Sequence, residues 1–186
     1  MRRARRILLL ASAGALALAA AGCAEPVPDP EPLSVTRAAE VYLEAICPVN
    51  EAWDAADVEL DRLRLAATRE GASSTAAFAE AMGVVAERSG DAASTLGSEE
   101  RSWPEAAEGP VAAVAETLAA DREQASRVAE LPVEDVVDYQ WDGADDIGAT
   151  AAEARAALDL PADADEACAA WRASREAAEK TEEDAQ

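Results

Sequence analysis

The sequence predicts an all-α protein, an up-and-down four-helix bundle with a kinked first helix and a short C-terminal fifth helix. Alanine, the strongest helix former, accounts for 50 of the 186 residues. Four successive segments place apolar residues at alternating spacings of four and three, which is the pattern of bundle helices. The connections between them are short, and no segment of useful length has the two-residue period of a strand.

The start of the chain has the pattern of an export signal. Four arginines within the first six residues precede an uncharged, mainly apolar run at 7–21. A membrane-spanning helix needs about 20 apolar residues, so this shorter run is typical of a secretory signal peptide. Its end, Ala20-Ala21-Gly22-Cys23, resembles the bacterial lipobox, with Ala20 where that motif usually has leucine. We therefore expect a signal peptide at 1–22 and lipidation of Cys23, with an ordinary secretory signal as the alternative.

Residues 23–35 are predicted to be a linker. Prolines at 26, 28, 30 and 32 alternate with acidic residues, which favours an extended, self-repelling segment. A lipid anchor followed by such a spacer predicts attachment to the cell membrane on its extracytoplasmic face, provided that several acyl chains are attached.

The first helix is predicted to begin near Thr36, a favourable capping residue, and to end at Gly71. Proline removes a backbone hydrogen bond, so we expect a kink or a short break at Pro48. The apolar positions of this helix are Tyr42, Ile46, Val49, Trp53, Ala56, Leu60, Leu63 and Ala67.

The second helix is predicted to begin at Ser73 or Ser74 and to run to Leu96. The third is predicted from Trp103-Pro104 to Leu131, since proline is favoured at a first helical position. The stripe of the second helix is Phe78, Met82, Val85, Ser89, Ala92 and Leu96. The stripe of the third is Ala107, Val111, Val114, Leu118, Ala125 and Val128.

The fourth helix is predicted from Glu134 to Asp159, with Asp142-Gly143 as a point at which it breaks in two. Its apolar positions are Val137, Trp141, Ala144, Ile147, Ala151, Ala154 and Leu158.

A capping-box pattern at Asp163 and Glu166 predicts the short fifth helix, which extends through Cys168 and Trp171. These five helices form one predicted domain at 36–175. Residues 176–186 are polar and acidic, and we expect them to be a disordered tail.

Several local motifs resemble landmarks of uncharacterised actinobacterial helical lipoproteins. The resemblance covers most of residues 36–171 and implies the fold, but it implies no activity, because the group as a whole has none established. Its motifs are Tyr42-Leu43, Cys47-Pro48-Val49-Asn50, Trp103-Pro104, Leu158-Asp159-Leu160-Pro161 and Cys168.

Cys47 and Cys168 are the two cysteines that remain once Cys23 is lipidated. In an exported protein such a pair is typical of a disulfide rather than of two free thiols. We therefore predict a bridge that fastens the fifth helix to the first.

The charge and the absence of histidine exclude several functions. Removing residues 1–22 removes four arginines and no acid, which leaves 38 acidic and 12 basic residues and a formal charge of −26. Such a surface repels phosphate backbones, so we expect no nucleic-acid partner. Without histidine the chain lacks Ser–His and Cys–His nucleophile pairs and the usual zinc and di-iron ligand sets. We expect no metal, no cofactor and no catalytic residue.

The sequence therefore predicts a non-catalytic component of the cell envelope that interacts with another envelope protein. The alternative is a lipoprotein that binds a small ligand in a pocket between its helices. Trp53 and Trp141 are the candidate pocket residues, although both lie on apolar stripes and core packing also explains them. An apolar cavity reached by either tryptophan favours the alternative, whereas an apolar surface patch among the acids favours a protein partner.

Overall fold

The computed structural model describes residues 30–69 and 74–184, and this part of the chain is all-α, as predicted. Apart from one isolated β-bridge, the described residues contain no strand pairing. The helices are α1 Val35–Arg69, α2 Ala76–Leu96, α3 Glu105–Val128, α4 Val133–Val137, α5 Ala144–Ala157 and α6 Ala164–Asp184.

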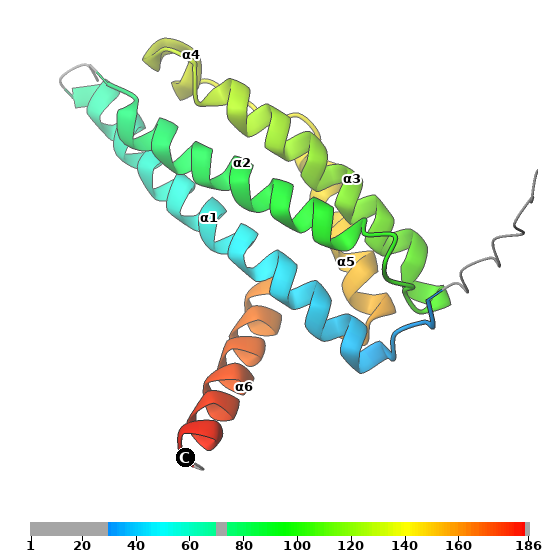
Figure 1. Cartoon of the computed structure of the whole chain (residues 1–186). Helices are drawn as coiled ribbons and strands as arrows, with labels where there is room; N and C mark the ends of the chain where they lie inside the picture. The colour runs from blue at the N-terminus through cyan, green and yellow to red at the C-terminus, as the bar shows by residue number, and fades with distance from the viewer. Residues whose placement is uncertain (1–29, 70–73, 185–186) are drawn as a thin grey trace, which may run out of the picture.

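Three long helices, α1, α2 and α3, pack side by side and form the body of the molecule (Figure 1). The place of the predicted fourth helix is taken by two shorter ones, α4 against α1 and α5 against α3. The architecture is thus a helical bundle whose fourth member is divided.

The division occurs at the predicted position. Gly143 has a φ of 80°, a left-handed conformation that favours glycine and that redirects the chain into α5. Because the helix is interrupted, its apolar stripe changes phase: Val136 is fully buried, whereas the predicted Val137 is partly exposed and the predicted Ala144 is exposed. The stripe was therefore wrong at those two positions and right at its end, where Leu158 is buried.

The buried stripes of α2 and α3 are confirmed throughout, because every predicted apolar position in them is buried. The core has two clusters. One lies around Cys47, Cys168 and Trp103, and the other lies around Phe78, Met82 and Val136. Trp53 packs against both clusters and marks the boundary between them.

Pro48 does not interrupt α1, which continues as helix on both sides of it. The alternative of a short break was therefore wrong. The carbonyl that loses its hydrogen bond belongs to Glu44, four residues earlier, whose side chain is exposed to solvent.

The end of the predicted linker belongs to the folded part. The Leu33 N–H donates to the Ser102 carbonyl oxygen at 2.8 Å, and Pro32 forms an isolated bridge with the same residue. The predicted signal peptide, Cys23 and the first part of the linker lie outside the described residues. Within the described ranges, no helix combines the length and the hydropathy needed to cross a bilayer.

The last helix, α6, is longer than the short fifth helix that was predicted. Asp163 Oδ1 accepts the Glu166 N–H at 2.8 Å, as the capping pattern predicts, but the helix continues to Asp184. The domain was expected to end at residue 175 and to be followed by a disordered tail. Alanine and glutamate, which favour helix, are common in this segment and account for the difference. Figure 1 shows α6 leaving the bundle and projecting away from it.

Candidate ligand-binding site

The disulfide between Cys47 of α1 and Cys168 of α6 is present, with an S–S distance of 2.08 Å and Cα atoms 5.5 Å apart. Both cysteines are buried, and Ala167 and Trp171 of α6 pack against the same core cluster. The first turns of α6 are therefore the part that is attached to the bundle. Disulfides form and persist mainly in oxidising compartments, so this bond indicates an extracytoplasmic location for the domain.

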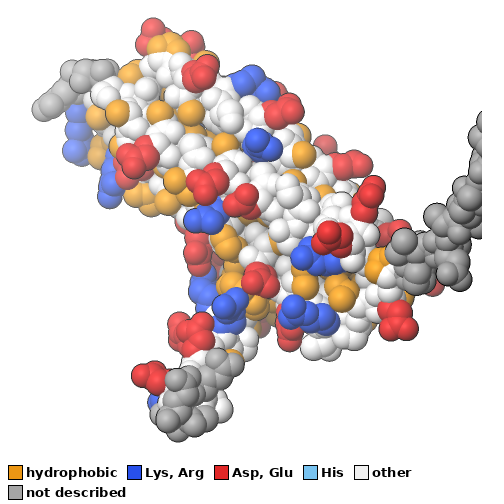
Figure 2. All heavy atoms as spheres, in the orientation of Figure 1, with side chains coloured by type: hydrophobic (Ala, Val, Ile, Leu, Met, Phe, Trp, Pro, Cys, Tyr) orange, Lys and Arg blue, Asp and Glu red, His pale blue; other side chains and the backbone are white. Residues whose placement is uncertain are grey.

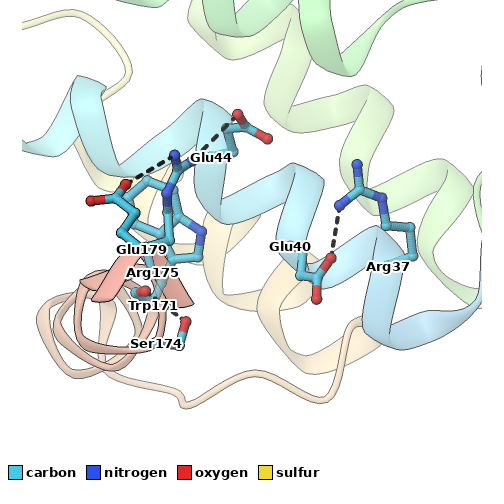
Figure 3. A network of polar contacts seen from close by, with 7 residues as sticks. All are labelled: Arg37, Glu40, Glu44, Trp171, Ser174, Arg175 and Glu179. Atoms are coloured by element: carbon cyan, nitrogen blue, oxygen red, sulfur yellow. Dashed lines mark hydrogen bonds and ion pairs between the residues drawn. The ribbon is translucent and has the colours of Figure 1, made fainter. Parts of the chain in front are cut away.

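Beyond the disulfide, α6 makes polar contacts with α1 (Figure 3). Arg175 lies between Glu44 of α1 and Glu179 of α6, at 3.6 and 3.8 Å, with its guanidinium 5.4 Å from the centre of the Trp171 ring. All three charged side chains are at least half exposed, so each ion pair contributes little to stability. The hollow beside them, about 580 Å³, is open and lined mainly by charged and small side chains. This junction holds α6 in place and offers no enclosed site.

The two candidate pocket residues, Trp53 and Trp141, are brought together by the fold. Trp53 is on α1, and Trp141 is in the segment between α4 and α5. Their ring centres are 4.6 Å apart and their planes are nearly perpendicular, at 89°. Tyr139, from the same segment, meets Trp141 edge to face at 6.2 Å. The break in the fourth helix is what allows this segment to turn its aromatic side chains toward α1.

A partly enclosed cavity of about 120 Å³ lies at this junction. Its inner side chains, which include Phe78, Met82 and Val136, are buried and apolar. Its outer side chains are partly or fully exposed, and Asp57 is the charged one among them. The complete lining is Trp53, Ala56, Asp57, Leu60, Phe78, Met82, Val128, Val136, Tyr139 and Trp141. Ligand pockets usually measure about 300–1,000 Å³, so this cavity suits only a very small molecule.

The carboxylate of Asp57 is in an unfavourable environment for a negative charge. Partial burial and the nearby carboxylates of Asp54 and Asp61 raise its pKa, whereas the Arg64 guanidinium opposes that rise. Arg64 also donates from Nε to the Val137 carbonyl oxygen at 3.3 Å. The rim of the cavity therefore has more negative than positive charge.

A second cavity, about 90 Å³, lies on another side of Trp53 and is lined by residues of α1, α3 and α5. Among its lining residues is Asp121, which is only 5% exposed. Burial raises the pKa of Asp121, and the hydrogen bond from Trp141 Nε1 to its Oδ1, at 2.9 Å, opposes the rise. Tyr42 also contributes to the lining, and its buried hydroxyl has no hydrogen-bond partner among the described residues.

Sequence reasoning missed the polar residues that hold the aromatic segment. Asp121 accepts from Trp141, and Gln124 Nε2 donates to the Tyr139 hydroxyl at 3.0 Å, although both polar residues are buried on α3. A signal was present: Asp121 stands three residues after Leu118 and four before Ala125, at a stripe position otherwise reserved for apolar residues. A buried acid in such a position needs a partner, and Trp141 supplies it.

Other parts of the surface are less enclosed. A groove of about 880 Å³ between α2 and α3 is lined by small residues such as Gly90 and Ala115, with Arg122 and Glu123 at its edges. In the part of the chain that the structure describes, no three acidic or cysteine side chains are grouped closely enough to hold a metal ion.

Comparison with known proteins gives no match among protein-family models, curated proteins or solved structures. The resemblance to actinobacterial helical lipoproteins thus stays a prediction, and the function has to be argued from the residues themselves.

Proposed function

We propose that this chain is a lipid-anchored, extracytoplasmic helical-bundle protein without catalytic activity, and that it acts as an interaction component of the cell envelope. The pattern of the leader, the lipobox-like Cys23 and the disulfide support the compartment. The absence of histidine from the whole chain argues against most nucleophilic and metal-dependent chemistry.

One surface feature supports a protein partner. Val58 and Leu65 on α1 and Val84 on α2 are large apolar side chains that are 49%, 49% and 41% exposed. Figure 2 shows apolar side chains at the end of the α1–α2 pair that lies away from α6, among both acidic and basic ones. Exposed apolar side chains on a chain with a formal charge of −22 fit a partner protein that presents apolar side chains within a basic surface.

The anchor is tested by Cys23→Ser, which removes the proposed lipid attachment site. The variant should leave the membrane fraction and appear in the soluble or secreted fraction. Unchanged membrane association would contradict the lipid anchor.

The protein partner is tested with a photo-reactive amino acid placed at Val58 or Val84 in cells. The same group at Ala112, an exposed position of α3, is the matched control. We expect one discrete cross-linked product from Val58 and Val84 that weakens at high salt and is absent from Ala112. Equal cross-linking at all three positions, or none, would contradict an interface on this face.

A specific observation also favours the second function, binding of a small ligand. The cavity at Trp53 and Trp141 is apolar inside, is preformed, and is reached by both tryptophans that the sequence singled out. A ligand in this cavity should shift the NMR signals of the Trp53 and Trp141 indole groups and leave those of Trp103 unchanged. Indole signals that do not respond to any small probe would contradict this function.

A further inference from the structure

The cavity at Trp53 and Trp141 concentrates the aromatic side chains of this protein. The whole chain has four tryptophans, two tyrosines and one phenylalanine. Four of these seven line the one cavity of about 120 Å³: Trp53, Phe78, Tyr139 and Trp141. They come from α1, α2 and the segment between α4 and α5, so no single helix pattern accounts for their convergence.

The aromatic rings are arranged as walls at steep angles to one another. Trp53 and Trp141 meet at 89°, and Tyr139 and Trp141 meet at 70°. The Trp53–Trp141 pair is in edge-to-face contact, so the edge of one indole covers part of the face of the other. Quaternary ammonium groups are bound by clusters of aromatic rings, because a ring face that stays open attracts a cation.

Hydrogen bonds hold two of these rings before any ligand arrives. Trp141 donates to Asp121 at 2.9 Å, and the Tyr139 hydroxyl accepts from Gln124 at 3.0 Å. Asp121 and Gln124 do not line this cavity, so the polar ends of both rings are occupied elsewhere. The rings therefore offer the cavity their carbon surfaces, already oriented.

The charge at the rim has the sign that a cation requires. Asp57 lines the cavity, and Asp54 and Asp61 follow the same face of α1. Partial burial, and after it the carboxylates of Asp54 and Asp61, raise the pKa of Asp57, and a bound cation would relieve the repulsion among the three carboxylates. Arg64 donates from Nε to the Val137 carbonyl oxygen, keeps its positive charge and offsets part of this negative field.

Size and hydrogen bonding narrow the class of cation. An engineered cavity of about 150 Å³ holds benzene, so a cavity of about 120 Å³ suits a ligand group of roughly five heavy atoms. An unmethylated ammonium needs an acceptor for each of its three N–H groups, whereas the only charged acceptor in the lining is Asp57. A quaternary ammonium group has no N–H and needs no acceptor.

From these observations we infer that the cavity bounded by Trp53, Tyr139 and Trp141 binds a small quaternary ammonium group, with Asp57 as its counter-charge. The inference rests on the second proposed function, ligand binding, and names its ligand class. Packing of an apolar core explains aromatic rings, but it does not require three partly exposed rings around a carboxylate.

The test uses the full chain with its disulfide intact and titrates it with tetramethylammonium, with choline, and with 3,3-dimethylbutan-1-ol. The last compound has the shape of choline with carbon in place of the charged nitrogen. Binding is measured by calorimetry and by the indole NMR signals. We expect both cations to bind and the neutral alcohol to bind at least about tenfold more weakly, as cation–π attraction in a desolvated site requires.

Two variants test the location. Tyr139→Leu removes one wall and should weaken choline binding about twofold to thirtyfold, the range for one cation–π contact. Asp57→Asn removes the counter-charge at an exposed position, where the fold does not depend on it, and should also weaken choline. The matched controls are Trp171→Leu on α6 and Asp91→Asn on α2, which lie outside the cavity lining and should leave binding unchanged.

The outcomes separate this inference from the function on which it rests. Equal binding of choline and the neutral alcohol would overturn the cation preference but leave ligand binding in place. Failure of every probe to bind would overturn both. Choline binding that is unaffected by Tyr139→Leu and Asp57→Asn would overturn the location.

Discussion

The disulfide between Cys47 and Cys168 should make a large contribution to the stability of the whole domain, although it attaches only one helix. Its two cysteines are 121 residues apart, so the reduced, unfolded chain gains the freedom of a very long loop. In the chain-entropy description a loop of this length corresponds to about 5 kcal/mol, taken as an upper value because the reduced unfolded chain retains some structure.

The expected change in melting temperature follows from the size of the domain. For a chain of this length, a loss of 1 kcal/mol lowers Tm by about 2–4 °C. Reduction should therefore lower Tm by up to about 10–20 °C. The contacts that remain between α6 and the bundle are those of Ala167 and Trp171 with the core and a few exposed ion pairs. In the reduced protein α6 should accordingly be the first helix to lose protection from amide exchange.

The assay compares thermal unfolding of one preparation before and after reduction, so the sequence stays the same. The double variant Cys47→Ala/Cys168→Ala is the control, since its Tm should not respond to the reductant and should lie near that of the reduced protein. Oxidised and reduced forms that melt within about 2 °C of each other would refute the entropic reasoning.

Four further changes test individual features. Ser89→Ala removes a fully buried hydroxyl that has no partner among the described residues, and it should raise the free energy of unfolding in urea by about 1 kcal/mol. Asp159 has a φ of 55° at the C-terminal end of α5, a left-handed conformation that glycine adopts more readily. Asp159→Gly should therefore raise the free energy of unfolding by about 1 kcal/mol, and a fall instead would show that the aspartate side chain has a role of its own. Burial raises the pKa of Asp121, so the folded state holds the carboxyl proton more strongly than the unfolded state does, and the free energy of unfolding falls as pH rises above 3.8. Asp121→Asn still accepts the hydrogen bond from Trp141 and has no charge to bury. This variant should be more stable than the wild type at neutral pH and should lose that advantage near pH 3. Deletion of residues 176–186 should lower helix content by circular dichroism but leave Tm nearly unchanged, since the described side chains there are exposed; a large fall in Tm would mean that this end of α6 packs on the body.

The sequence by itself determined the three long helices and the buried faces of the second and third. The stripes of the second and third helices were correct at every position, because a repeat of four and three leaves only one side of a helix apolar. The paired cysteines, the break at Gly143 and the capping of α6 by Asp163 were also predictable, since each depends on local chemistry or on the compartment.

The tertiary structure alone decided how the fourth helix and the aromatic residues are arranged. The shift of burial from Val137 to Val136 follows from the length of the interruption, which no periodicity reports. The meeting of Trp53 with Trp141 joins residues 88 positions apart through the packing of α1 against the segment after α4. Asp121 was not among the predicted stripe residues, yet it orients Trp141 from within the core. Contacts of this kind depend on which helices become neighbours, and a single sequence carries that information only through the fold.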